Sequence, residues 1–253
     1  LVSLLLSSPA LGSADDLFPS FDVSVAAQGL EQPDGLALHP VSGELYVSEE
    51  AAGRISVIRD GRAIPVVSST FPVGGEVPDY LITAERPRSA WLEGRLLSPE
   101  GIAFGPDNRL YVVEDTPRGR LLSFETDASG RYPQAQLVPV PELGEPYAWE
   151  SLCFGKDGQL FLAGSSFEGS QTWGYSCVLA RDTTQTWWMA DYGPLASFSA
   201  LTLMDDEQVL VAGDESVGSL TWWDLEKHRE IQTLNQSLGA LEGLCVLPDG
   251  SVV

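Results

Sequence analysis

Carboxylate side chains recur at one position of a segment that appears five times along the sequence. The second residue of the segment reads Asp34, Glu100, Glu150, Ser199 and Glu242. Carboxylates held close together repel one another, which raises their pKa unless protons or a cation compensate. Oxygen ligands suit Ca²⁺, and the sequence has no cluster of histidine and cysteine of the kind that Zn²⁺ prefers. The pattern therefore predicts a calcium site formed by Asp34, Glu100, Glu150 and Glu242.

Two interpretations of these acids are open. They share a divalent cation, or they cap strand ends and line a solvated channel without one. In the first case Asp34 and Glu100 are ligands, while Glu150 or Glu242 is a ligand or the general base of a hydrolytic reaction. The sequence contains no serine, cysteine and histidine arrangement for a covalent nucleophile, no P-loop and no dinucleotide fingerprint.

The elements that must position these acids are short strands. Each segment reads as a strand, a turn rich in Pro, Asp, Gly or Asn, and a second strand, and the mean spacing of the units is about 52 residues. Apolar segments at 54–61, 120–130, 177–182 and 219–225 supply a third strand, and those at 63–67, 135–140, 186–191 and 231–234 a fourth. Four antiparallel strands at this period predict an all-β protein, a β-propeller.

The repeat also predicts how much of the propeller is present. Four units are complete, and the fifth stops at Val253 inside its second strand, so we expect about five blades, partly or wholly present, of a six-bladed whole. Residues 21–27 predict a lone leading strand. Residues 1–14 are apolar and then small, typical of a partial signal peptide, which leaves 15–253 as a single propeller domain truncated at its C-terminus. Secretion or export to a periplasm follows.

A second set of polar residues ends the second strands, at Glu50, Asp115, Ser165 and Asp214. Because the first and second strands run antiparallel, the start of one lies beside the end of the other. Both sets therefore meet at one rim, and we expect a ring of up to seven carboxylates at one mouth of the central channel. The small third residue of each unit, such as Gly35, lets the innermost strands crowd the axis.

Composition limits the classes of partner. The formal charge of −22 disfavours binding to nucleic acid or to an anionic membrane surface. The apolar run at the N-terminus is too short to span a membrane. Three cysteines give no disulfide framework, and Cys153 and Cys245 occupy one repeat position that predicts small core residues. The partner is then a small-molecule substrate or a protein ligand.

One insertion interrupts the period. The spacing from Asp34 to Glu100 exceeds the others, and the surplus lies in residues 70–98, which carry Tyr80, Trp91 and several arginines. Long loops on rigid scaffolds often carry function. This excursion either faces a ligand or is a surface feature.

The motifs PDGLAL, PEGIAF and LEGLCV, each followed by a turn and a strand of the LYV kind, resemble those of a known family. The chain from about residue 30 to 253 is similar to the six-bladed propellers of the gluconolactonase and senescence marker protein family. It resembles NHL-repeat, strictosidine-synthase-like and paraoxonase propellers more loosely, and phytase-like esterases over a shorter stretch. The family holds its metal through Glu, Asn and Asp at this second position, which implicates Asp34, Glu100, Glu150 and Glu242; asparagine is absent here.

Two functions follow as hypotheses. The first is a Ca²⁺-dependent hydrolase of lactones or esters, in which the ion polarises the carbonyl and a carboxylate moves the proton. The second is a non-catalytic exported propeller, in which the acids hold a structural ion and the protein serves as a binding or structural module.

Overall fold

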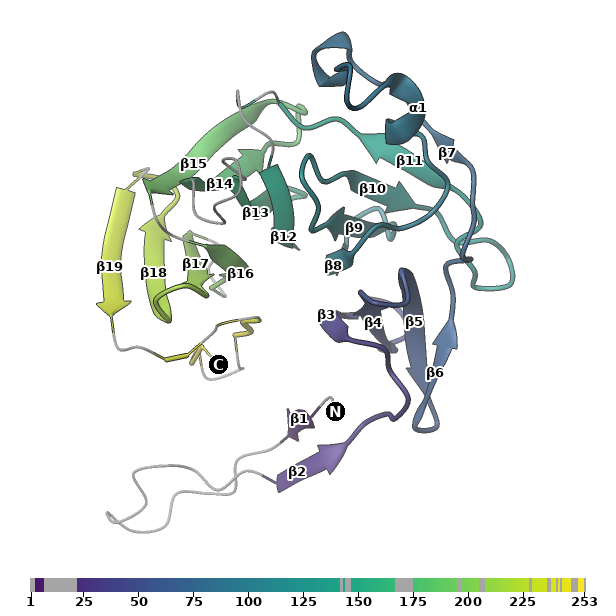
Figure 1. Ribbon diagram of the computed structural model, residues 1–253. Coiled ribbons are helices and arrows are strands. Elements are labelled where there is room, and N and C mark those ends of the chain that lie inside the picture. The colour runs from purple at the N-terminus through teal and green to yellow at the C-terminus, as the bar shows by residue number, and fades with distance from the viewer. Residues whose placement is uncertain are drawn as a thin grey trace.

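Four sheets of antiparallel strands are arranged radially around a centre, so the chain folds as an all-β propeller (Figure 1). The computed structural model describes residues 3–6, 22–141, 143, 147–166, 175–194, 197–204, 208–227, 229–235, 238–239, 241, 243–246 and 250–252. Each sheet is one blade, and its first strand lies innermost (Figure 1). The predicted fold class is confirmed.

The blade strands follow the sequence repeat. Blade 1 comprises β3 (Pro33–Leu38), β4 (Leu45–Glu49), β5 (Arg54–Arg59) and β6 (Arg62–Pro65). Blade 2 comprises β8 (Pro99–Phe104), β9 (Leu110–Glu114), β10 (Leu121–Phe124) and β11 (Ala135–Val138). Blade 3 comprises β12 (Tyr147–Phe154), β13 (Leu160–Ser166), β14 (Tyr175–Arg181) and β15 (Trp187–Pro194). Blade 4 comprises β16 (Phe198–Leu203), β17 (Val209–Asp214), β18 (Ser219–Asp224) and β19 (Arg229–Asn235).

Two further regions lie at the ends of the repeat. β1 (Ser3–Leu6) pairs antiparallel with β2 (Asp22–Val25), so residues 22–25 form a strand as expected, although its partner is β1. In the fifth unit, an isolated antiparallel bridge joins Val246 to Val252 across the predicted turn. Most of residues 1–14 lie outside the described residues, and the signal peptide stays a prediction.

The turns between the first and second strands show why the repeat contains Asp and Gly or Asn. Asp107 Oδ1 accepts a hydrogen bond from the Arg109 amide at 3.2 Å, and Asp157 Oδ1 accepts one from the Gln159 amide at 2.9 Å. Asn108 follows Asp107 with φ of 59°, in the left-handed region that Asn tolerates well. These turns lie at the rim opposite the start of the inner strands.

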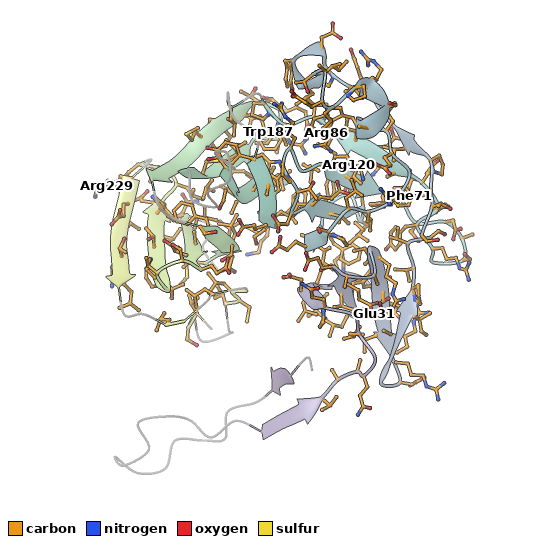
Figure 2. All side chains as sticks on the ribbon, in the orientation of Figure 1. Glu31, Phe71, Arg86, Arg120, Trp187 and Arg229 are labelled. Carbon is orange, nitrogen blue, oxygen red and sulfur yellow. The ribbon has the colours of Figure 1, made fainter. Side chains whose placement is uncertain are left out.

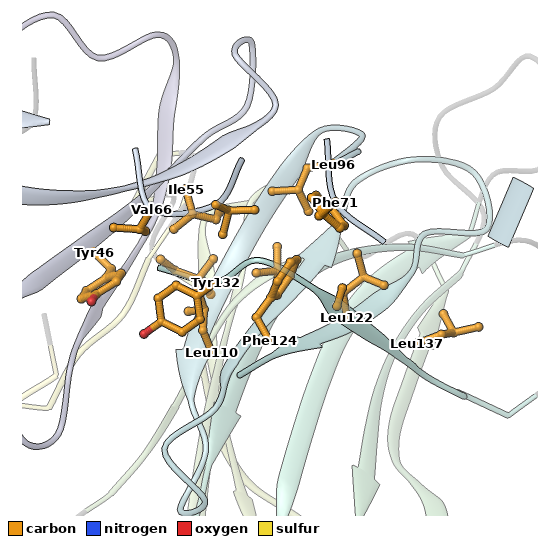
Figure 3. Close-up of a cluster of buried hydrophobic side chains, with 14 of the residues drawn as sticks. Tyr46, Ile55, Val66, Phe71, Leu96, Leu110, Leu122, Phe124, Tyr132 and Leu137 are labelled. Carbon is orange, nitrogen blue, oxygen red and sulfur yellow. The ribbon is translucent and has the colours of Figure 1, made fainter. Parts of the chain in front are cut away.

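The hydrophobic core consists of layers between neighbouring blades. One cluster joins blades 1 and 2 and includes Tyr46, Ile55, Leu122 and Phe124 (Figure 3). Two others join blade 2 to blade 3 and blade 3 to blade 4. Because a blade is covered on both faces, β9 is buried at every residue, which explains its continuous apolar sequence.

The three cysteines differ in burial, and both short helices contribute a buried side chain to the core, Leu81 and Trp91. Cys177 is buried and Cys153 packs beside the cluster between blades 3 and 4, but Cys245 is exposed, so the core prediction is wrong for Cys245. The described residues contain only two short helices, η1 (Asp79–Leu81) and α1 (Arg88–Trp91), and neither has the length to span a bilayer.

Candidate functional site at the acidic end of the channel

A β-bulge interrupts each inner strand at the position of the recurring acid. The pairing of β3 with β4 shifts between Pro33 and Leu36, and that of β8 with β9 shifts between Pro99 and Ile102. The register also shifts on either side of Glu150 in β12 and of Ser199 in β16. An extra residue leaves the ladder and redirects its side chain. The bulge thus sets Asp34, Glu100, Glu150 and Ser199 apart from the ladder at the same end of their strands.

Small residues beside the bulges let neighbouring inner strands touch. A Cβ added to Gly35 would lie 2.3 Å from the carbonyl oxygen of Glu100 in the next blade. A Cβ on Gly101 would lie 2.7 Å from the carbonyl oxygen of Glu150. Ser48 Oγ accepts a hydrogen bond from the Gly35 amide at 2.7 Å and donates one to the Glu100 carbonyl at 2.6 Å. The expected crowding of the axis is present.

Glu100 is half-buried at this end of the inner strands. Its Oε2 atom is buried and has no hydrogen-bond partner among the described residues. Burial raises the pKa of the Glu100 carboxyl to about 11, and the negative charges of Asp115, Asp34, Glu150 and Glu50 add to this effect. An isolated carboxylate in such a place is costly. Glu100 is therefore held protonated at neutral pH unless a positive charge compensates.

The acids around Glu100 come from three blades. Asp34 and Glu50 belong to blade 1, Asp115 follows β9 in blade 2, and Glu150 lies in β12 of blade 3. Burial raises the pKa of Asp115, with further contributions from Glu50 and Glu215. Ser197 Oγ donates to Glu150 Oε1 at 3.5 Å, a long contact. The structure thus brings Asp34, Glu100 and Glu150 into one electrostatic neighbourhood, as the repeat predicts.

Other predicted members of the ring have different roles. Asp214 accepts hydrogen bonds from the Ser197 amide at 3.2 Å and from the amide and hydroxyl of Ser216 at 2.9 and 2.6 Å, so it caps a turn. Ser199 donates to the Leu241 carbonyl and links blade 4 to the fifth unit. Glu242 lies outside the described residues, and its predicted role as ligand or base stays a prediction.

Two acids next to the ring are neutralised by arginines that the sequence interpretation overlooked. Arg54 donates to both carboxylate oxygens of Glu49, at 2.8 and 2.7 Å. Arg120 does the same to Glu114 at 2.7 and 2.6 Å, and both side chains of this pair are fully buried. A signal was available, since Arg54 is the first residue of β5 and Arg120 immediately precedes β10, each a short turn after its acid.

Arg120 also fixes the 70–98 excursion to blade 2. Its guanidinium donates to the carbonyl oxygens of Glu93 and Arg95, both at 2.6 Å. Trp91, in α1, is 2% exposed and donates to the Leu81 carbonyl at 2.8 Å. β7 (Val73–Gly74) pairs with β11, and the excursion lies along the outer side of blade 2 (Figure 1). The excursion is therefore a packed part of the core between blades 1 and 2.

The donor set suits a hard cation, but the described side chains do not enclose one. Carboxylate oxygens are the ligands that Ca²⁺ prefers, and the lone Oε2 of Glu100 lacks a partner. Within the described part of the chain, no three Asp, Glu, His or Cys side chains lie close enough to hold an ion. The residues fit calcium by chemistry, and a complete ligand set needs side-chain movement or further ligands.

The comparisons with known proteins find likeness in structure alone. No protein-family model matches the sequence, and no curated protein matches it. A gluconolactonase from Xanthomonas campestris superposes with a TM-score of 0.62 at 16% identity, covering 91% of this chain and 71% of that one. A second protein, a candidate gluconolactonase, gives 0.62 at 13% identity and covers 90% and 73%.

A third solved structure carries a different chemistry on a similar scaffold. Streptogramin B lyase superposes with a TM-score of 0.53 at 17% identity and covers 92% of this chain and 65% of that one. At these identities the likeness shows the β-propeller fold. The chain is structurally similar to gluconolactonases and to a lyase, and this similarity does not identify its reaction.

Proposed function

We propose that the acidic end of the channel binds a divalent cation, with calcium as the ion, and that the protein hydrolyses a lactone or ester there. The observation that carries this proposal is the buried Glu100 Oε2 without a hydrogen-bond partner, next to several other acids. A cation at this point would compensate both the burial and the repulsion. The two gluconolactonase-like structures support the reaction class through their similar scaffold.

The proposal gives each acid a role. Asp34, Glu100 and Glu150 are the ligands within the described residues, and Glu242 would add a fourth. When bound, the ion supplies polarisation of the substrate carbonyl and stabilises charge on its oxygen. Glu150, which Ser197 Oγ approaches to 3.5 Å, accepts a proton from the attacking water, and Glu242 is the other candidate base. The bulges bring these residues to one end of the inner strands, and their side chains would close around the ion when it binds.

Calorimetric titration with calcium tests the cation site directly. We expect the protein to bind calcium and Glu100→Gln to weaken binding at least tenfold. Glu226→Gln is the matched control, since Glu226 is exposed in the turn before β19 at the opposite rim. If the protein takes up no calcium, or if both variants bind it equally, the cation site is wrong.

Hydrolysis is tested separately. Carboxylate release from a panel of lactones and esters should require calcium and stop in chelator, and Glu150→Gln should lose activity while keeping its fold. If calcium binds and no member of the panel is hydrolysed, the non-catalytic alternative, a binding or structural module with a structural ion, is favoured.

We also propose that the protein works outside the cytoplasm, secreted or in a periplasm. The support is the apolar run at 1–14 followed by small residues. N-terminal sequencing of protein recovered from outside the cytoplasm should begin near Asp15. Recovery of the chain only from the cytoplasm, with residues 1–14 attached, would contradict this.

A further inference from the structure

The turn between β3 and β4 begins with a histidine where the equivalent turns of blades 2 and 3 begin with glycine. In those two blades Gly105 and Gly155 open a five-residue turn, and the amide of each donates to the carbonyl of the last turn residue, at 3.0 and 2.9 Å. In blade 1 His39 takes this place, and its amide donates to the Glu44 carbonyl at 2.9 Å. The turn of blade 1 has six residues, one more than the other two.

The imidazole of His39 stabilises this longer turn. Its Nδ1 atom accepts hydrogen bonds from the Val41 and Ser42 amides, both at 3.2 Å. A ring nitrogen that accepts in this way carries no proton, so the proton of the neutral imidazole lies on Nε2. Aspartates accept from the amide two residues on in the turns of blades 2 and 3, and here Ser42 Oγ does so, from the Glu44 amide at 3.3 Å. The histidine is therefore an additional acceptor, which the glycines of the shorter turns cannot supply.

The same ring also contacts the neighbouring blade. Side chains fill the space between blades 1 and 2 (Figure 2). There the His39 ring lies edge-on to Phe104 of blade 2, with ring centres 4.7 Å apart, and its centre is 6.0 Å from that of Tyr46 in β4. Phe104 and Tyr46 meet edge-on at 5.0 Å, as Phe154 and Tyr111 do at 4.8 Å between blades 3 and 2. His39 thus adds a third ring to an aromatic contact that recurs between blades.

The charged neighbours of His39 belong to its own blade. A hydrogen bond from Arg59 is the main cause of the lowered pKa of the Glu44 carboxyl, and the charge of His39 makes a smaller contribution. Both Glu44 oxygens accept from Arg59, at 2.5 and 3.1 Å, so this carboxylate is already paired. The rings of Tyr46 and Phe104 that pack against the imidazole carry no charge. A proton added to Nδ1 would therefore face two amide donors beside a carboxylate that already has a cationic partner.

We propose that His39 is a pH-sensitive switch, which holds the turn of residues 39–44 closed against blade 2 at neutral pH and releases it in acid. Protonation of Nδ1 turns the acceptor of two hydrogen bonds into a donor and puts a positive charge beside two amide N–H groups. Histidine changes its charge between about pH 5 and 8, whereas aspartate, the acceptor in the other turns, ordinarily stays ionised down to about pH 4. Acid therefore opens the turn of blade 1 and leaves those of blades 2 and 3 closed.

Amide hydrogen exchange measured by NMR, corrected for the intrinsic rate at each pH, tests the switch. We expect the Val41 and Ser42 amides to lose about tenfold or more of their protection between about pH 7.5 and pH 5, because two hydrogen bonds are lost. The Arg109 amide, which donates to Asp107, should keep its protection over the same range. In His39→Asn the side-chain oxygen accepts from nearby turn amides without titrating, so protection should be equal at both pH values.

His228→Asn is the matched control, because it removes the other histidine of the sequence and should leave the pH dependence unchanged. Nitrogen chemical shifts of the His39 ring should also show the proton on Nε2 at neutral pH. The switch is wrong if the wild-type turn is equally protected at both pH values, if His39→Asn shows the same loss in acid, or if Nδ1 carries the proton at neutral pH. Should His39→Asn fail to fold, the wild-type exchange and the ring tautomer decide the question without it.

Discussion

Glu49 is buried and Glu100 is half-buried with a buried Oε2 atom, and although both acids lie near one rim of the same propeller, their surroundings differ completely. Burial acts to raise the pKa of Glu49, but hydrogen bonds from Arg54, Ser56 and the Glu31 amide outweigh it, and the net pKa is lowered. Burial of Glu100 is reinforced by four other carboxylates, and its pKa is raised to about 11. The first acid is part of the scaffold, and the second is poised to accept a proton or a cation.

The difference follows from where each acid lies in its blade. Glu49 and Glu114 end second strands and face an arginine across a short turn. Glu100 sits in a bulge beside the axis, where the neighbouring inner strands supply carbonyl oxygens and further acids. Neighbouring blades can therefore place acids of opposite character at one rim, and the following experiments test that contrast.

The largest loss of stability is expected when one partner of a buried ion pair is removed. Arg120→Met leaves Glu114 buried without its partner and releases the carbonyl oxygens of the excursion, so the free energy of unfolding should fall by about 3–5 kcal/mol. Urea unfolding measures the loss. The double variant Arg120→Met with Glu114→Gln should recover part of it, because no uncompensated charge is left. A double variant no more stable than Arg120→Met would show that the carbonyl contacts matter more than the charge.

A smaller loss of stability is expected when the packing beside the bulge is disturbed. In Gly35→Ala the new Cβ meets the Glu100 carbonyl, a backbone atom that must shift. We expect a loss of about 1–3 kcal/mol, the usual result of overpacking. Gly243→Ala is the control, since a Cβ there meets nothing within 4 Å. Equal melting temperatures for the two variants would mean that the inner strands separate easily.

The third prediction concerns pH. In the absence of cations, the native state keeps the Glu100 proton up to about pH 11, whereas the unfolded chain releases it near its ordinary value of 4.5. Between these values the native state binds more protons, so this group makes stability fall as pH rises, by up to about 1.4 kcal/mol per pH unit. Glu100→Gln should remove this dependence, and its advantage over wild type should grow from pH 5 to 9.

Thermal unfolding in chelator from pH 5 to 9 tests this pH dependence. Glu49→Gln serves as its contrast, because the pKa of Glu49 is lowered and its charged form is the stabilised one. Parallel pH profiles for wild type and Glu100→Gln would show that Glu100 is solvated and carries no special proton.

The smallest loss of stability is expected when a surface ion pair is removed. Arg59 donates to Glu44 at the opposite rim, and their side chains are 47% and 29% exposed. Arg59→Gln should cost about 0.2–1 kcal/mol, and added salt should shrink the difference. A loss as large as that of Arg120→Met would mean that burial does not separate these two classes of ion pair.

The strands and their order could be predicted from the sequence because they repeat. Alternating apolar residues and Asp-containing turns indicated the four strands of each blade, and residues 231–234, for example, fall within β19. The acid position beside the axis followed from the antiparallel hairpin alone. These inferences needed only local patterns and the two-residue period of a strand.

The neutralised acids and the bulges could not be predicted in the same way. A bulge adds one residue to one strand, and the aligned segments differ by no more than that, so its position is invisible in the spacing. Arg120 lies six residues after Glu114, but its contacts with Glu93 and Arg95 depend on how the excursion folds. The excursion has no repeat to follow, and its packing on blade 2 is a tertiary outcome.

Ser48 links two blades, and this link should make their unfolding cooperative. Its hydroxyl joins the Gly35 amide in blade 1 to the Glu100 carbonyl in blade 2, and Leu201 likewise donates from blade 4 to Ser151 Oγ in blade 3 at 3.2 Å. Blades linked in this way behave as coupled units in which opening one removes contacts from the next. Amide hydrogens of the inner strands should therefore exchange together, and a substitution at Ser48 should speed exchange in blade 2 as well as in blade 1.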